Sequence, residues 1–199
     1  MLLSQGYNLL VEDIPSSLQT APDSAPNMQA SDVVALLRLL EDNHIDVWVD
    51  GGWGVDALLG EQTRPHGDLD IAMQQKDVPA LRELLVSHGY QDVERGDSKV
   101  WNFVLGDAKG HLLDVHAVVF DAARNGLFGP ADQGIMYPAA SLTGTGTIAG
   151  YPVKCIAAKY VVFFHSRYDP RQNDLQDVAA LCERFGIKYP DEYGNYKRR

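Results

Sequence analysis

Two aspartates separated by one apolar residue constrain this chain more than any other feature of its sequence. The run Asp68-Leu69-Asp70-Ile71 is expected to lie on a β-strand, where residues two apart point to the same side. The two carboxylates then share a polar face, while Leu69 and Ile71 face a core. Adjacent carboxylates disfavour each other's ionised form unless a cation lies between them. Mg²⁺ is the expected cation, because it prefers carboxylate oxygens and completes its shell with waters and substrate phosphates.

A strand, a glycine turn and a helix are expected immediately upstream. Val47 to Val49 is a β-prone apolar run, Asp50-Gly51-Gly52 is expected to be a turn, and Trp53 to Leu59 is expected to be a short helix closed by Gly60. Glycine lets a ligand approach the backbone closely, and free N–H groups at a helix start favour anions. The pattern therefore predicts a site for a triphosphate.

A third acid, Asp114, lies in the apolar run Leu112 to His116. On a strand beside the first two aspartates it would complete a set of three carboxylates. Two of them holding metal, and a third that ligates it or accepts a proton, suffice for in-line transfer of a nucleotidyl group. His116 shares a strand face with Asp114, and it is expected either to line the acceptor site or to be a hydrogen-bonded strand histidine.

These residues resemble the antibiotic nucleotidyltransferases of the polymerase-β-like superfamily. The resemblance is strongest to the lincosamide nucleotidyltransferases and the aminoglycoside 2″-adenylyltransferases, and it extends from about residue 31 to about residue 187. Its specific part is the combination of a double glycine, an Arg-x-His and an Asp-x-Asp. The segments that carry it are Gly51 to Gly60, Thr63 to Ile71, Cys155-Ile156, Phe164 to Asp169, Asp174 and Asp177.

The resemblance implies an α+β fold: a polymerase-β-like nucleotidyltransferase domain, with helices on one face of a mixed sheet, plus a small C-terminal helical part. It also implies transfer of AMP, or another nucleoside monophosphate, from ATP or another nucleoside triphosphate to a small-molecule hydroxyl. Pyrophosphate is released, and two magnesium ions assist. Position by position, Asp68 and Asp70 match the metal-binding pair, Asp114 the third acid, and Gly51 and Gly52 the phosphate-holding turn. The superfamily's usual Gly-Ser is Gly-Gly-Trp here, so backbone amides must hold the phosphate.

Four further residues are candidates for nucleotide binding. Arg64 and His66 directly precede the carboxylates, where a cation can meet the triphosphate; the alternative is a surface arginine and a loop histidine that caps a turn. Lys159 is expected on the first C-terminal helix, where the resembling enzymes often place a triphosphate-binding lysine, or else on a solvated helix face. Trp53 is expected either to stack on a base or drug or to belong to the core.

Two other patterns favour structural roles. Asp174 and Asp177 lie one helical turn apart, and we expect them to pair with Arg171 or Arg167 rather than to bind a second metal. The segment Gly144 to Gly150 is glycine-rich but lacks the Lys-Ser/Thr ending of a phosphate loop, so a connecting loop is expected.

Composition limits the class of protein and of partner. The chain has 199 residues, 45% of them hydrophobic, and no run approaches the roughly 20 apolar residues of a membrane span. No secretory signal pattern begins it, so a soluble cytoplasmic protein with reduced cysteines is expected. A net charge of −10 argues against a nucleic-acid partner, because tracking a phosphate backbone requires a basic surface. It is compatible with a cationic antibiotic as acceptor.

The sequence leaves several functional alternatives open. A lincosamide acceptor is favoured over an aminoglycoside by the C-terminal resemblance, while a monomer and a homodimer are equally compatible. Adenylylation of a protein side chain would differ only in the acceptor. A fold that has lost catalysis and serves as a nucleotide-binding or antitoxin-type module is a further alternative, against which the intact acids argue.

The expected organisation has three parts. Residues 1–28 form an N-terminal extension or mobile arm, residues 29–130 the nucleotidyltransferase domain, and residues 131–199 a loop and a C-terminal helical part. The first helix is expected to be capped by Ser31. The other expected elements are a strand at 69–73, a helix at 76–88, strands at 90–94, 100–105 and 111–120, a loop-rich segment at 130–151, and helices at 155–165 and 172–185.

Overall fold

The computed structural model describes residues 28–132, 134–191 and 193, so residues 1–27 of the expected N-terminal extension lie outside the described residues. None of the helices in the described ranges combines the length and apolar character that crossing a membrane requires. The helices are α1 (Ala30–Asp42), α2 (Gly51–Leu59), η2 (Gln75–Asp77), α3 (Val78–Ser87), η3 (Ala139–Thr143), α4 (Ala158–His165) and α5 (Gln172–Phe185). The strands are β1 (Val47–Asp50), β2 (Leu69–Gln74), β3 (Gln91–Val93), β4 (Asn102–Gly106), β5 (Leu112–Phe120), β6 (Gly126–Phe128), β7 (Ile135–Tyr137), β8 (Gly144–Ile148) and β9 (Tyr151–Cys155).

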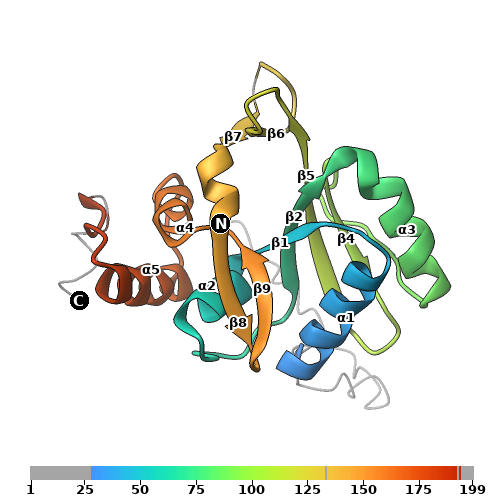
Figure 1. Ribbon diagram of the computed structural model, residues 1–199, viewed down its shortest axis with the longest axis horizontal. Coiled ribbons are helices and arrows are strands. Elements are labelled where there is room, and N and C mark those ends of the chain that lie inside the picture. The colour runs from blue at the N-terminus through green and yellow to red at the C-terminus, as the bar shows by residue number, and fades with distance from the viewer. Residues whose placement is uncertain (1–27, 133, 192, 194–199) are drawn as a thin grey trace, which may run out of the picture.

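One mixed sheet organises the chain. Its main path is β3-β4-β5-β2-β1-β9-β8, with β6 paired to β5 and β7 paired to β6 (Figure 1). The central strand β2 runs parallel to β5 and antiparallel to β1, and β1 runs parallel to β9. The α+β fold expected from the sequence is confirmed.

Alternation along the central strands divides the apolar residues between two cores. Val49, Ile71 and Val115 point to the side covered by α1 and α3, where one cluster of buried residues forms. Ala72 and Val118 point to the other side, where a second cluster includes residues of α4 and α5. The helices α1 and α3 therefore cover one face of the sheet, and the C-terminal helices pack on part of the opposite face (Figure 1).

The first helix differs from the prediction at its start. Gln29, not Ser31, is the N-cap residue, and the Gln29 N–H donates to the Asp32 carboxylate at 3.2 Å. The predicted amphipathic pattern is confirmed, since Val33, Leu36, Leu37 and Leu40 are buried.

The prediction was wrong for the segment that precedes the C-terminal helices. Residues 130–151 are not mainly loop, since β7, η3 and β8 lie there, and Cys155 ends β9 rather than beginning a helix. The glycine-rich run belongs to the β8–β9 hairpin. Its glycines let β8 lie against the backbone of α2: a Cβ at Gly146 would lie 2.1 Å from the Ala57 carbonyl oxygen. Close packing against a distant helix, which spacing alone does not reveal, explains the composition.

Gly146→Ala is therefore expected to lower the free energy of unfolding by about 1–3 kcal/mol, because the methyl group meets backbone rather than a flexible side chain. Gly96→Ala is the matched control, since a Cβ there meets nothing within 4 Å. Urea unfolding of the two variants measures the difference, and equal stabilities would contradict the close packing of β8 on α2.

Candidate active site

Three aspartates form a row across adjacent strands. Asp50 on β1 pairs with Asp70 on β2, and Asp70 pairs with Asp114 on β5. Residues paired across neighbouring strands point to the same face, so the three carboxylates lie side by side on the face opposite α1 and α3. His116, two residues along β5, joins them: one ligand atom each from Asp70, Asp114 and His116 lie within 4.8 Å of one another.

Asp68 lies at the edge of this cluster rather than on its strand. The strand β2 begins at Leu69, so the expectation that Asp68 is a strand residue is wrong. Its carboxylate is close enough for its charge to raise the pKa of Asp70. Arg95, in the connection between β3 and β4, lies between two of the acids: its Nη1 is 3.0 Å from Asp114 Oδ2 and its Nη2 is 3.9 Å from Asp68 Oδ2.

The central carboxylate has the least compensated charge. Burial, followed by the charge of Asp68, raises the pKa of Asp70 to about 7. Burial also raises the pKa of Asp114, although the charges of His116 and Arg95 partly oppose it. Asp70 and Asp114 are therefore the acids that a bound cation would stabilise most.

Asp50 and His116 compensate each other. Burial would raise the pKa of Asp50, but its interactions with His116 and with the Gly51 N–H lower it. Burial would lower the pKa of His116, but Asp50, Asp70 and Asp114 raise it to about 9. His116 Nδ1 lies 3.6 Å from Asp50 Oδ2, and Tyr137 also donates a hydrogen bond to Asp50 at 3.2 Å. Asp50 and Tyr137 were not identified from the sequence, because their positions depend on strand register and distant chain segments.

A metal ion fits this set of residues. Asp114 Oδ1 is buried without a hydrogen-bond partner among the described residues. Buried polar atoms without a partner are costly, and a cation among Asp68, Asp70 and Asp114 would satisfy this carboxylate oxygen.

Gly51 makes room for the central carboxylate. It is the first residue of α2, so the predicted separate turn is wrong, and the strand passes directly into the helix through Asp50. Gly51 has φ +55°, and a Cβ there would lie 2.0 Å from Asp70 Oδ2. The Gly51 N–H donates to Asp50 Oδ1 at 2.9 Å. The N–H groups of Gly52 and Trp53 also lie in the first turn of α2, where a helix supplies no internal acceptor. The predicted closure of the helix by Gly60 is confirmed, and Gly60 adopts the left-handed conformation.

Arg64 and His66 belong to a hydrogen-bonded network behind the glycines. His66 is buried; its Nε2 lies 2.5 Å from Asp56 Oδ2 and its Nδ1 lies 3.0 Å from Arg64 Nη1. An arginine can only donate, so Nδ1 accepts and Nε2 carries the proton that goes to Asp56. A Cβ at Gly52 would lie 2.3 Å from His66 Nδ1. Gly52 thus lets the segment before Asp68 pack against α2.

The same network reaches α5. Arg64 Nη2 lies 2.8 Å and its Nε 3.3 Å from the two carboxylate oxygens of Asp177, which is 4% exposed. The prediction that Asp177 pairs with Arg171 or Arg167 is wrong, while the Arg171 backbone N–H does donate to Asp174 at 2.8 Å.

The two remaining candidates lie in different environments. Trp53 is 1% exposed in the core, with its ring centroid 4.7 Å from that of His66. Lys159 is exposed on α4 and lines a depression of about 580 Å³ together with residues 186–191. A nucleotide contact by either residue stays a prediction.

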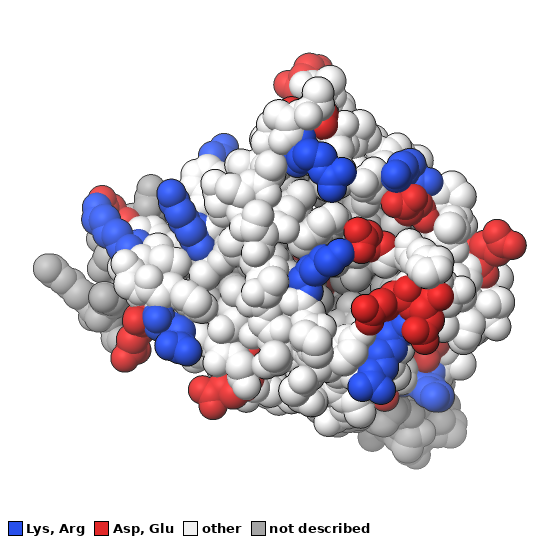
Figure 2. Space-filling model, in the orientation of Figure 1, with Lys and Arg blue, Asp and Glu red and all other residues white. Residues whose placement is uncertain are grey.

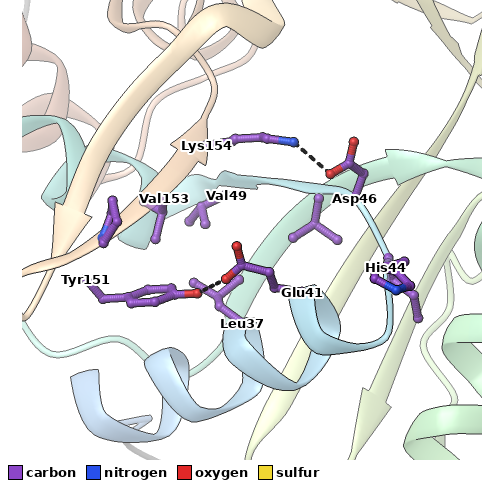
Figure 3. Close-up of a pocket in the computed structure, with 11 residues that line it drawn as sticks. Leu37, Glu41, His44, Asp46, Val49, Tyr151, Val153 and Lys154 are labelled. Carbon is purple, nitrogen blue, oxygen red and sulfur yellow. Dashed lines mark hydrogen bonds and ion pairs between the residues drawn. The ribbon is translucent and has the colours of Figure 1, made fainter.

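A separate cavity of about 420 Å³ lies on the other side of the sheet (Figure 3). Leu37, Val49 and Val153 form part of its apolar wall, while Tyr151 donates to Glu41 and the ion pair between Lys154 and Asp46 lies nearby. Acidic side chains gather over the C-terminal end of α1 on this face (Figure 2). Val49 points into this cavity, and the next residue of β1, Asp50, points to the opposite face with the other carboxylates. The strand β1 therefore separates the cavity from the candidate active site.

Comparisons with known proteins agree with this geometry. The sequence profile of the aminoglycoside-2″-adenylyltransferase family matches residues 32–181. The lincosamide resistance protein of Staphylococcus haemolyticus is 27% identical over 157 residues, which cover 78% of this chain and 95% of that protein. A 2″-aminoglycoside nucleotidyltransferase of Escherichia coli is 27% identical over 137 residues, which cover 67% of this chain and 70% of that protein.

A solved structure shares the fold. The crystal structure of the lincosamide antibiotic adenylyltransferase LnuA, with lincomycin bound, superposes with a TM-score of 0.69 at 24% identity. The superposition covers 81% of this chain and 99% of that one.

Asp177→Asn is expected to lower the free energy of unfolding by about 2–4 kcal/mol, because Arg64 then loses its charged partner at a site where Asp177 is 4% exposed. Asp92→Asn is the matched control: Asp92 also binds an arginine, Arg82, at 2.6 Å, but at the surface, where the expected cost is about 0–1 kcal/mol. Chemical unfolding measures both, and equal costs would show that the buried network does not stabilise the fold.

Asp70→Asn is expected to stabilise the metal-free protein in a pH-dependent way. The folded pKa of Asp70, about 7, lies above the value of about 4 for an unfolded aspartate, so this residue's contribution to stability falls as pH rises between those values. The variant should therefore match the wild type near pH 4 and exceed it by about 1–3 kcal/mol at pH 8. Thermal unfolding in EDTA across this range measures the gain, and a gain that does not depend on pH would contradict the assignment.

Proposed function

Because the chain belongs to the aminoglycoside-2″-adenylyltransferase family, we propose that it transfers AMP from ATP to a hydroxyl of a lincosamide antibiotic with the help of magnesium. Membership makes it an antibiotic-modifying nucleotidyltransferase, with a nucleoside triphosphate as co-substrate and a small molecule as acceptor. The magnesium requirement, the site residues and the choice of acceptor are the parts that the proposal adds.

The observation that carries the proposal is the pairing of Asp70 with Asp114 across β2 and β5, beside Asp68. These three acids are the proposed catalytic and metal-binding residues. Mg²⁺ held by them would draw charge from the phosphates and orient them for in-line displacement. The raised pKa of Asp70 supports a cation at this position, as does Asp114 Oδ1, which has no hydrogen-bond partner within the described part of the chain.

The chain's own residues then carry the proton and the leaving group. Asp114 accepts the proton of the acceptor hydroxyl while the hydroxyl oxygen attacks the α-phosphorus. The raised pKa of Asp114 suits this carboxylate to that role. The bond between the α-phosphorus and the bridging oxygen breaks, and pyrophosphate leaves toward the start of α2. There the N–H groups of Gly52 and Trp53 are proposed to bind phosphate.

The remaining candidate residues differ in how readily they can reach a nucleotide. Arg64 already binds Asp177, and His66 is 4% exposed and bonded to Asp56, so we propose that they act by holding the segment that leads to Asp68. Lys159 is exposed and stays the proposed lysine for the triphosphate.

The extent of the sequence similarity supports a lincosamide acceptor. The alignment covers 95% of the lincosamide resistance protein but 70% of the aminoglycoside enzyme, at the same 27% identity. The alternative acceptor is an aminoglycoside, which the family profile favours by its description. Both classes carry amines, which suit a chain with a net charge of −10.

Pyrophosphate release from ATP and Mg²⁺ is expected with lincomycin or clindamycin and not with a panel of aminoglycosides. Asp114→Asn should lower kcat by about 10²–10⁴-fold, because the variant keeps the shape of the residue but cannot accept the proton. Coupled phosphate detection measures the rate, and mass spectrometry confirms an added AMP on the drug.

Pyrophosphate release with aminoglycosides alone would contradict the lincosamide acceptor and identify an aminoglycoside as the acceptor. ATP binding without release for any drug would contradict the proposal and favour a binding module. Label on a protein rather than on a drug would favour protein adenylylation.

A further inference from the structure

Arg95 forms ion pairs with two of the proposed metal ligands, at 3.0 Å to Asp114 Oδ2 and at 3.9 Å to Asp68 Oδ2. We propose that Arg95 competes with Mg²⁺ for Asp68 and Asp114 and so sets the metal affinity of the site. This inference rests on the proposed function, since it concerns the same carboxylates. It adds a residue that neither the motifs nor the family resemblance indicated.

The two oxygens of Asp114 are in different environments. Oδ2 lies 3.0 Å from Arg95 Nη1, whereas Oδ1 is buried, 3.7 Å from His116 Nε2, and has no hydrogen bond to any residue that the structure describes. A cation that used both oxygens, or that bridged Asp114 and Asp68, would take Oδ2 from the guanidinium. The ion pair and the metal therefore draw on the same lone pairs.

The turn that carries Arg95 fixes its backbone. The Arg95 N–H donates to the Ser98 hydroxyl at 2.9 Å, and the Ser98 N–H donates to the Arg95 carbonyl at 3.0 Å. These reciprocal bonds hold the backbone of the β3–β4 connection while the side chain extends to the acids. Arg95 is thus held beside the site rather than reaching it by chance from a flexible loop.

The exposure of Arg95 makes its release inexpensive. Its side chain is 38% exposed, and those of Asp68 and Asp114 are 37% and 16% exposed, so water can solvate the guanidinium and Asp68 once they separate, while the incoming cation takes over the charge of Asp114. The Arg64–Asp177 pair is the contrast, because the side chain of Asp177 is buried and its arginine cannot leave without stranding that charge. Of these two pairs, only the one at the metal site is suited to exchange.

To displace the Arg95 guanidinium, Mg²⁺ must offset the attraction between that guanidinium and the carboxylates. Removing the arginine leaves the same carboxylates with a larger uncompensated negative charge, which attracts Mg²⁺ more strongly. It also removes a favourable pair from the metal-free protein. Removing Arg95 should therefore raise the metal affinity and lower the stability of the metal-free protein. A purely structural role for Arg95 predicts only the loss of stability.

Arg95→Met is therefore expected to bind Mn²⁺, used as a probe for Mg²⁺, about tenfold more tightly than the wild type at low ionic strength. Its metal-free midpoint of unfolding should be lower, and Mg²⁺ should raise that midpoint by more than it does in the wild type. Arg95→Lys, which keeps the charge but loses the forked geometry, should bind Mn²⁺ with intermediate affinity.

Arg82→Met is the matched control. Arg82 also binds an aspartate, Asp92, at 2.6 Å near the same hairpin, but away from the carboxylate row. Titration calorimetry and the electron paramagnetic resonance of Mn²⁺ measure affinity without turnover. Arg82→Met should leave the Mn²⁺ affinity unchanged.

Two outcomes would overturn the inference in distinguishable ways. Equal or weaker Mn²⁺ binding by Arg95→Met and Arg95→Lys, with normal binding by the wild type, would overturn the competition alone. Absence of Mn²⁺ binding by every protein, with ATP binding intact, would overturn the metal assignment in the proposed function and the competition with it.

Discussion

Repulsion among aligned carboxylates is the constraint on which the rest of the site depends. Because β2 pairs with both β1 and β5, Asp70 has an aspartate on each side, and nothing in the sheet itself separates the charges. Two neighbours compensate the charges: His116 is charged beside Asp50, and Arg95 lies 3.0 Å from Asp114. Gly51 leaves the space that the Asp70 carboxylate fills. The apolar core of this face begins only beyond this row of charges.

The sequence predicted the acids that lie in regular strands but not their neighbours. Alternation predicted a strand that carries Asp70 and a shared face for Asp114 and His116, since both inferences need only local periodicity. Asp50 was assigned to a turn, because its role follows from register with β2. No local sequence pattern indicates Arg95, because it lies in the connection between β3 and β4 and contacts Asp114 on another strand.

The sequence also could not tell which basic side chains already have a protein partner. Arg64 and His66 stand beside the acids in the chain, which is compatible with phosphate binding. Whether an arginine is available depends on its partner, and Arg64 binds Asp177, which lies 113 residues away in sequence. Asp56 likewise binds His66 from the preceding helix. The partners of these charged residues are distant in sequence. Residue spacing therefore predicts the chemical type of a site better than it predicts which residue binds ligand and which binds protein.

Exposure separates the charges that build the site from the charges that respond to ligands. The Arg64–Asp177 pair and the His66–Asp56 pair are largely buried, so breaking either one would strand a charge or an unpaired polar group in the protein interior. Arg95 makes the same kind of contact with Asp114, but the Arg95 side chain is 38% exposed, so water can solvate the guanidinium when it leaves. The buried pairs keep Asp68 and the start of α2 in place whatever binds. Adjustment to a divalent cation then falls to the exposed side of the carboxylate row, where the bonds that must break are the weakest.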